Sequence, residues 1–257
     1  MSVLFLSDIH FHDAHSPGGR AVLDLLDGSR DATAIYLVGD VFDFWLGHRS
    51  TLYRAAFPLL RRLAEVVEAG VEVHLFSGNH DPDPGDFFKE IGVVVHEGPH
   101  EIQLERTGGG PPWRVRMEHG DLVDPRGIHH RVLCQAVRHP VSRRLARLVH
   151  PGVMWAMAQR YARSNGHVYG EPLPAGLLSD YLPRQARAGV DVLIMGHYHR
   201  AVHHRATVAG RPVRFYGLGD WVQQRTWLAF DGEFRLLRYQ GIGQPPTELP
   251  EGDHDPE

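Results

Sequence analysis

Apolar and polar positions follow a pattern along the chain that changes near Gly92. Before this residue, short apolar runs alternate with segments of helical spacing, which favours parallel strands joined by crossover helices. Beyond it, strand-like runs follow one another directly, so the chain is predicted to be mixed α/β. The predicted helices are Gly18–Asp27 and Thr51–Ala69, and Pro58 is expected to kink or divide the second. The predicted strands are Val3–Leu6, Ala34–Val38, Val71–Phe76, Val93–Val95, Glu101–Glu105, Trp113–Glu118, Asp191–Met195, Val202–Thr207, Val213–Tyr216, Thr226–Phe230 and Phe234–Tyr239.

The segment from residue 124 to residue 183 breaks this pattern and is predicted to be a helical insertion. Eight arginines but a single acid, Asp124, lie between residues 124 and 167. Five apolar residues recur at helical intervals and predict an amphipathic helix. They are Val137, Val141, Leu145, Leu148 and Val149. One interpretation is a helical cap that packs on the core with solvated arginines. Another is a lid whose apolar face receives an acyl chain while the arginines attract an anionic headgroup or a membrane surface.

The division of the chain into parts follows from these patterns. Residues 1–123 and 184–240 are predicted to form the core, and residues 124–183 the lid. The last stretch, 241–257, is rich in proline and acidic residues, and it is predicted to be a disordered tail.

Composition argues against several classes of protein. No segment approaches about eighteen uninterrupted apolar residues, so neither a membrane span nor a signal peptide is expected. The 257 residues include one cysteine, which rules out an intramolecular disulfide and fits the cytoplasm. The formal net charge of −4 argues against general affinity for nucleic acid, and no protein partner is predicted.

Five short polar motifs each follow a predicted strand. They are Asp8-Ile-His10, Gly39-Asp40-Val-Phe-Asp43, Gly78-Asn79-His80-Asp81, His119-Gly120-Asp121 and Gly196-His197-Tyr-His199. Each motif alone is weak, because Gly-Asp is a common turn and a lone His-x-His is often a surface pair. Loops at the carboxyl ends of strands converge on one crevice, however, so these side chains can meet. Their mixture of carboxylate, imidazole and amide oxygen suits Mn²⁺, Fe²⁺ or Zn²⁺ better than Mg²⁺ or Ca²⁺.

With these motifs the sequence resembles the calcineurin-like metallophosphoesterase superfamily over about residues 1–123 and 184–238. The resemblance implies a layered β-sandwich flanked by helices, which binds two divalent metal ions with Mn²⁺ preferred. The ligands that it implies for one metal are Asp8, His10, Asp40 and His199. Those that it implies for the other are Asp40, Asn79, His119 and His197, so that Asp40 bridges the pair.

The same resemblance implies a two-metal hydrolysis. Two cations about 3.5–4 Å apart hold phosphate oxygens and lower the pKa of a bridging water toward about 7, so that a hydroxide attacks phosphorus in line. His80 and Asp43 match a histidine–aspartate pair in which the histidine faces the phosphate and the aspartate orients it. His80 would either stabilise the developing charge or protonate the leaving oxygen, and both roles stay open.

A narrower resemblance, to the UDP-2,3-diacylglucosamine hydrolases of lipid A synthesis, extends nearly to Tyr239. It is carried by Gly39-Asp-Val-Phe-Asp-Phe-Trp-Leu-Gly47, by Leu218-Gly-Asp-Trp221 and by the place of the insertion. It implies an acylated nucleotide-sugar substrate that is cleaved to a lipid 1-phosphate and UMP at the cytoplasmic surface of the inner membrane. His80 stands where that family usually has arginine. The substrate-binding residues that it implies are Asn79, His80, Asp124, Arg131, Arg160, Arg163 and Asn165.

Other interpretations stay open. A phosphodiesterase for another nucleotide or a small phosphodiester would share the metal centre but show no preference for acylated substrates. A non-catalytic binding module would be expected to have lost ligands, whereas all seven ligand positions carry the expected residue types. A nuclease fits less well, because the basic residues are concentrated in one apolar-faced insertion.

Overall fold

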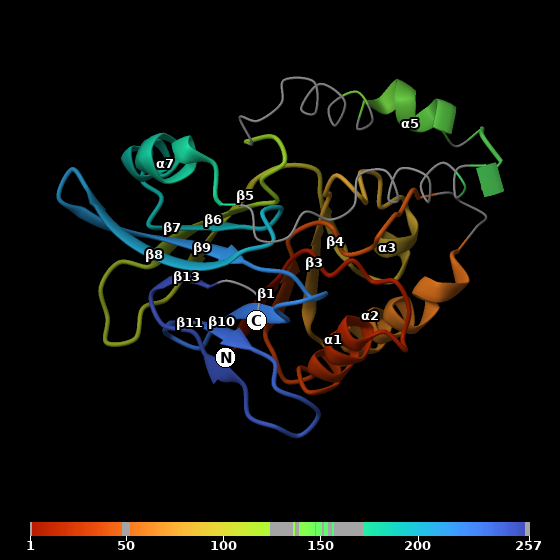
Figure 1. Ribbon diagram of the computed structural model, residues 1–257, viewed down its shortest axis with the longest axis horizontal. Helices are drawn as coiled ribbons and strands as arrows, with labels where there is room; N and C mark the ends of the chain where they lie inside the picture. Colours follow the sequence, from red (N-terminus) through yellow and green to blue (C-terminus); the bar gives the residue numbers. More distant parts are fainter. Residues whose placement is uncertain are drawn as a thin grey trace.

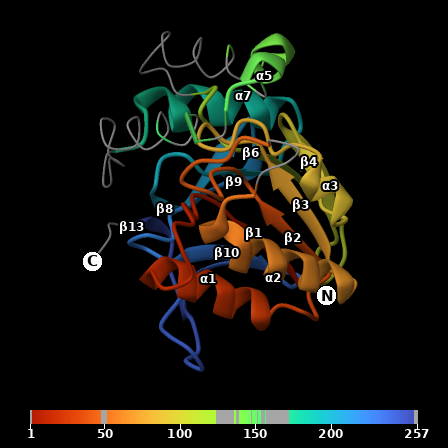
Figure 2. The ribbon, with the colours of Figure 1, turned by 90° about the vertical axis from the view of Figure 1, so that its right-hand side faces the viewer.

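Two β-sheets packed face to face form the body of the protein, with helices on their outer faces (Figures 1 and 2). This computed structural model describes residues 2–47, 52–123 and 172–254, together with 136, 139–146, 148–150, 152, 153 and 156. No helix within these residues is long and apolar enough to cross a membrane. The predicted class, a layered α/β sandwich flanked by helices, is confirmed.

The first sheet has seven strands in the order β12-β11-β10-β1-β2-β3-β4. Strands β1 to β4 run parallel to one another, and β10 joins β1 in the antiparallel sense. The carboxyl ends of β1, β2 and β3 therefore lie at one edge of the sheet. The strand bounds are β1 Val3–Leu6, β2 Ala34–Leu37, β3 Glu72–Phe76, β4 Val94–His96, β10 Thr226–Phe230, β11 Phe234–Arg238 and β12 Thr247–Glu248.

The second sheet has six strands in the order β13-β8-β9-β7-β6-β5. Its central strands β6, β7 and β9 are parallel, whereas β5, β8 and β13 pair in the antiparallel sense. All eleven predicted strands are present in the two sheets, with bounds that differ by at most two residues. The bounds in this sheet are β5 His100–Leu104, β6 Trp113–Glu118, β7 Val192–Met195, β8 Ala201–Val208, β9 Arg211–Leu218 and β13 Gly252–His254.

Capping and proline placement explain where the two helices on the first sheet begin. In α1 (Pro17–Asp27) the side chain of Ser16 accepts a hydrogen bond from the backbone N–H of Gly19. Pro58 lies in the first turn of α2 (Phe57–Glu68), where a missing N–H costs nothing, and a 3₁₀ turn, η1 (Arg54–Ala56), precedes it. The proline thus divides the predicted helix. The short helix α3 (Phe87–Glu90) was not predicted.

The core explains why β1 reads as a continuous apolar run. Leu4 and Leu6 pack among the residues under α1 and α2, while Val3 and Phe5 face the interior between the two sheets. Both faces of the strand are therefore buried, as in parallel sheets that are covered on both sides. The outer face of the second sheet is covered by the π-helix η2 (Leu177–Tyr181) and by α7 (Leu182–Arg187).

The structure differs from the sequence prediction in the tail. Residues 241–254, which composition predicts to be disordered, form β12 against β11 and β13 against β8. The backbone hydrogen bonds of two sheet edges hold this segment, and Leu249 is buried in the core between the sheets. Short strands at edges are compatible with a proline-rich, acidic composition, because few of their N–H groups need a partner.

The predicted lid is described only in part. The helix α5 (Pro140–Ala146) lies within the predicted amphipathic helix, and Figures 1 and 2 both place it on the opposite side of the molecule from α1. The side chains of Val141, Leu145 and Leu148 are 55%, 59% and 83% exposed. The helices η2 and α7, by contrast, pack on the second sheet, so the predicted boundary at residue 183 falls within a helical stretch that covers the core.

Acid is expected to destabilise the fold through His203, a buried histidine in β8. Burial, reinforced by the charge of Arg205, lowers the pKa of His203 to about 4. Because the unfolded chain binds this proton near pH 6.5, stability is complete above that pH and falls as the pH drops toward 4, by up to roughly 2 kcal/mol. Urea unfolding of His203→Gln, which keeps an acceptor for Tyr216 and Arg205, should show a flatter dependence between pH 6.5 and 4. Identical pH profiles for the two proteins would contradict this.

Candidate metal centre

All seven predicted metal ligands lie just beyond the carboxyl ends of strands, and the two sheets bring these ends together. Asp8 and His10 follow β1, Asp40 follows β2, and Asn79 follows β3. From the second sheet, His119 follows β6, while His197 and His199 follow β7. Parallel pairing within each sheet places these loops at one edge, as the motif pattern predicts.

The first group consists of Asp8, His10 and His199, which offer ligand atoms within 4.8 Å of one another. The Nε2 atoms of His10 and His199 lie 3.3 Å apart, and the Nε2 of His199 lies 3.6 Å from Oδ1 of Asp8. Atoms bound to one divalent ion at about 2.0–2.2 Å lie roughly 3–3.6 Å from each other. The spacing therefore fits a shared cation.

The second group consists of Asp40, His119 and His197, again within 4.8 Å. The Nε2 of His119 lies 3.3 Å from Oδ2 of Asp40 and 3.2 Å from Oδ1 of Asn79, which in turn lies 3.0 Å from Nδ1 of His197. The same Oδ2 of Asp40 lies 4.0 Å from Nε2 of His10 in the first group. Asp40 thus stands between the two groups, both of which could bind a metal ion.

Backbone strain is concentrated at these ligands. Asp8, His10, Asp40, His197 and His199 have φ values between 44° and 71°, and in the described residues only Ala209 and Arg225 join them among non-glycine residues. Residues other than glycine rarely adopt these φ values. Such backbone strain persists where the surrounding structure holds the residue in place, as it does at many functional sites. The motifs at Asp40 and His197 place a glycine directly before the predicted ligand, yet in both the predicted ligand itself has a positive φ.

Hydrogen bonds from neighbouring groups orient these ligands. The Nδ1–H of His119 donates to the backbone carbonyl of Val38 at 2.9 Å, so that Nε2 faces the site. The carboxylate of Asp81 accepts backbone N–H groups of Asp40 at 3.0 Å, Val41 at 2.7 Å and Gly78 at 2.8 Å. Asp81 therefore ties the loop after β3 to the loop that carries Asp40. Its role was missed in the sequence because it requires both loops to be in place.

Asp43 makes different contacts from those that the predicted histidine–aspartate pair implies. The Nδ1–H of His80 donates to the backbone carbonyl of Asp43 at 2.8 Å. The carboxylate of Asp43 instead contacts Nδ1 of His12 at 3.0 Å and lies 3.8 Å from Nδ1 of His10. One residue thus contacts three imidazoles. His12 was missed, although it stands two residues after His10 in the first motif.

Burial and opposite charges set the protonation of the cluster. Burial raises the pKa of Asp8 to about 8. Burial also disfavours the charge on Asp40, but His119 and His80 hold the pKa of that carboxyl well below its usual range. Burial alone would lower the pKa of His119, yet Asp40 raises it to about 10. A cation that binds Asp8 and His119 at neutral pH must therefore displace protons.

Of the other predicted substrate-binding residues, His80 offers a ligand atom within 4.8 Å of those of His10 and Asp40. Its backbone N–H donates to Oδ1 of Asp40 at 2.8 Å. Asp124, Arg131, Arg160, Arg163 and Asn165 lie outside the described residues.

A two-sheet α/β sandwich with carboxylates and imidazoles clustered at one shared edge is the architecture of a metal-dependent phosphoesterase. The chain belongs to the calcineurin-like phosphoesterase family, whose sequence profile matches residues 1–201. It is therefore a hydrolase of phosphoric esters, and its family implies divalent metal ions, for which the histidines and aspartates above are the candidate ligands.

Curated relatives match nearly the whole chain. A UDP-2,3-diacylglucosamine hydrolase of Pseudomonas putida is 31% identical over 250 residues, which are 93% of this chain and 99% of the relative. A protein of the same name from Porphyromonas gingivalis is 29% identical over 262 residues, 91% of this chain and 96% of the relative. Among solved structures, a Plasmodium protein described as the anchor in the inner membrane complex aligns over 100% of this chain and 88% of its own, with a TM-score of 0.51 and 9% identity. That likeness concerns the fold alone.

Proposed function

We propose that the protein hydrolyses the pyrophosphate of UDP-2,3-diacylglucosamine to the lipid 1-phosphate and UMP. The observation that carries this proposal is the match to UDP-2,3-diacylglucosamine hydrolases along 93% of the chain. This match continues well beyond residue 201, where the general family profile ends. In the reaction water adds to one phosphorus, the bridging P–O bond breaks, and the proton of the water is released.

Two divalent cations would be held at the metal centre. Asp8, His10 and His199 would bind one and Asn79, His119 and His197 the other, with Asp40 bridging both. The spacing of the two groups, which share Oδ2 of Asp40, supports this assignment. When bound, the cations would supply charge neutralisation of the phosphate and acidification of a water. The mixture of donors favours Mn²⁺, with Fe²⁺ or Zn²⁺ as alternatives.

His80 is the residue that we assign to the phosphate itself. Its Nδ1–H donates to the carbonyl of Asp43, which orients the ring, and we assign its Nε2 to the substrate. Its backbone N–H, bonded to Asp40, fixes its distance from the bridging carboxylate. There it would stabilise charge on a phosphate oxygen or give a proton to the leaving oxygen. Asp43 would then act by positioning His80 through its carbonyl.

The insertion is proposed as the part that selects an acylated substrate. The exposed Val141, Leu145 and Leu148 would contact acyl chains at the cytoplasmic face of the inner membrane, where such a substrate resides. Asn79, Asp124, Arg131, Arg160, Arg163 and Asn165 stay predicted contacts to the headgroup.

Hydrolysis assays with purified protein and Mn²⁺ test the proposal. We expect UMP to be released from UDP-2,3-diacylglucosamine at least about a hundredfold faster than from UDP-glucose, because acyl contacts contribute several kcal/mol to transition-state binding. Comparable turnover of UDP-glucose, or turnover of a chromogenic phosphodiester alone, would contradict the lipid substrate and leave the hydrolase class intact.

A second candidate is a phosphodiesterase for another nucleotide or a small phosphodiester. His80 favours it, because the narrower family usually has arginine at this position. An imidazole is shorter than a guanidinium group and cannot bind a diphosphate through two parallel N–H groups. The same assays separate the two candidates.

A further inference from the structure

A cavity of about 720 Å³ lies at the opposite end of the strands from the metal centre. We call it the arginine pocket, and it is lined by Arg106, Trp113, Arg205, Arg214 and Glu233, among others. Trp113 begins β6, six residues before the ligand His119, so about 20 Å of strand separates the two sites. In Figure 1 the β8–β9 hairpin and the loop between β5 and β6 extend to the left, away from α2 and α3.

The pocket brings three guanidinium groups together. Arg205 and Arg214 are direct partners across the antiparallel pair β8–β9. Like charges in this position destabilise a sheet. Arg214 and Arg106 in turn lie 4.5 Å and 3.6 Å from the centre of the Trp113 ring. Such a cluster is expected only where a counter-charge compensates for the repulsion.

The carboxylates near the pocket compensate for it incompletely. Glu233 lies 3.7 Å from Arg214, Glu251 lies 3.6 Å from Arg205, and Asp191 lies 3.9 Å from Arg106. These distances exceed the 2.7–2.9 Å or so of a charge-assisted hydrogen bond. Among the described residues, Nε of Arg106 and Nε1 of Trp113 are buried without a hydrogen-bond partner.

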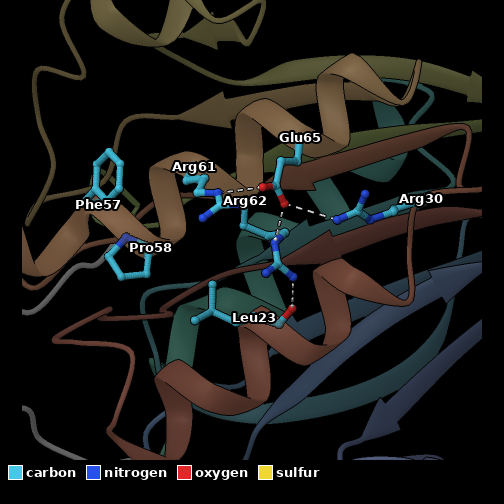
Figure 3. Close-up of a pocket in the computed structure, with 7 residues that line it drawn as sticks. All are labelled: Leu23, Arg30, Phe57, Pro58, Arg61, Arg62 and Glu65. Carbon is cyan, nitrogen blue, oxygen red and sulfur yellow. Dashed lines mark hydrogen bonds and ion pairs between the residues drawn. The ribbon is translucent and has the colours of Figure 1, made fainter.

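A second hollow in the protein holds arginines at shorter distances from a carboxylate. It lies between α1 and α2 and also contains three arginines (Figure 3). There a single carboxylate, that of Glu65, approaches all of them, at 3.2 Å for Arg30, 2.7 Å for Arg61 and 3.1 Å for Arg62. The arginines of this hollow therefore have a carboxylate at hydrogen-bond distance, whereas the carboxylates near the arginine pocket lie 3.6–3.9 Å from its arginines.

We propose that the arginine pocket binds a phosphate-bearing anion with two or more charges. Guanidinium groups bind phosphate oxygens in pairs, and the polar residues Thr107 and Thr207 also line the pocket. The volume suits a ligand from diphosphate to nucleotide size. This site is independent of the proposed reaction.

Calorimetric titration of the full-length protein with methylenediphosphonate, a stable diphosphate, tests the proposal. The proteins compared are wild type, Arg205→Ala, Arg205→Glu and, as the control from the second hollow, Arg61→Ala. Arg205 and Arg61 are both exposed, with side chains 55% and 71% accessible, so neither substitution removes buried structure. Binding at the metal centre contributes equally to all four. We expect Arg205→Ala to weaken a second binding event at least about tenfold and Arg61→Ala to leave it unchanged.

The charge reversal gives a signature that a general loss of structure does not. Arg205→Glu should abolish the second binding event, because it places a glutamate beside Glu251 in the wall of the pocket, while binding at the metal centre stays as in the wild type. A parallel titration with UMP identifies the source of the phosphate: tighter Arg205-dependent binding of UMP indicates a nucleotide, and weaker binding a free diphosphate. Equal binding by all four proteins, or equal losses in Arg61→Ala and Arg205→Ala, would overturn the proposal.

Discussion

Replacing Asp40 with alanine is expected to remove bound metal and hydrolytic activity together. Asp40 is 1% exposed, and its Oδ2 stands 3.3 Å from His119 and 4.0 Å from His10, so its loss opens both metal groups. Transition-state charge that a metal neutralises is worth several kcal/mol, which corresponds to a fall in kcat/KM of about a thousandfold or more. His119→Ala should behave similarly, because it removes a ligand of the second group.

Metal content measured by atomic emission, beside turnover of a chromogenic phosphodiester, checks this expectation. Asp231→Ala is a suitable control, since Asp231 is an exposed aspartate in the turn between β10 and β11, remote from the centre. The Tm of each protein distinguishes loss of ligands from loss of fold. Near-wild-type turnover in Asp40→Ala would contradict the bridging role, and metal retained without activity would point to a positioning role instead.

The clustering of the candidate ligands was predictable because each of its signals is local. A buried apolar run, a glycine and a polar ligand follow one another within a few residues at β2, β3 and β7. Parallel pairing then brings the loops together by a general rule of α/β sheets. The left-handed backbone at Asp8, His10 and Asp40 was not predictable, because the closure of several loops imposes it rather than the residue's own preference.

Contacts between distant segments account for the other differences. Asp43 was expected to orient His80, and the sequence did not indicate that its carbonyl would face His80 while its carboxylate contacts His12. Composition predicted disorder after residue 240, yet β12 and β13 occupy free sheet edges that the sequence does not reveal. The facing of Arg205 and Arg214 likewise depends on the register of the β8–β9 hairpin.

The other large effect is expected at the insertion, when Val141, Leu145 and Leu148 are all replaced by serine. These side chains are 55%, 59% and 83% exposed, so more than half of each is not covered by the described residues. If they contact acyl chains, each contributes about 1 kcal/mol of binding free energy, at about 25 cal/mol per Å² of apolar surface buried. Their joint loss should then lower kcat/KM for the acylated substrate on the order of a hundredfold.

The comparison of two substrates separates an acyl site from a structural cap. A chromogenic phosphodiester has no acyl chain, so its turnover by the triple variant should stay near that of the wild type. Ile242→Ser combined with Val94→Ser removes exposed apolar surface elsewhere, from side chains 73% and 48% exposed, and should affect neither substrate. If both substrates lose turnover equally in the triple variant, the insertion supports the core rather than the acyl chains. Lipid selection would then have to be assigned to another part of the chain, while the metal chemistry would stay with the core.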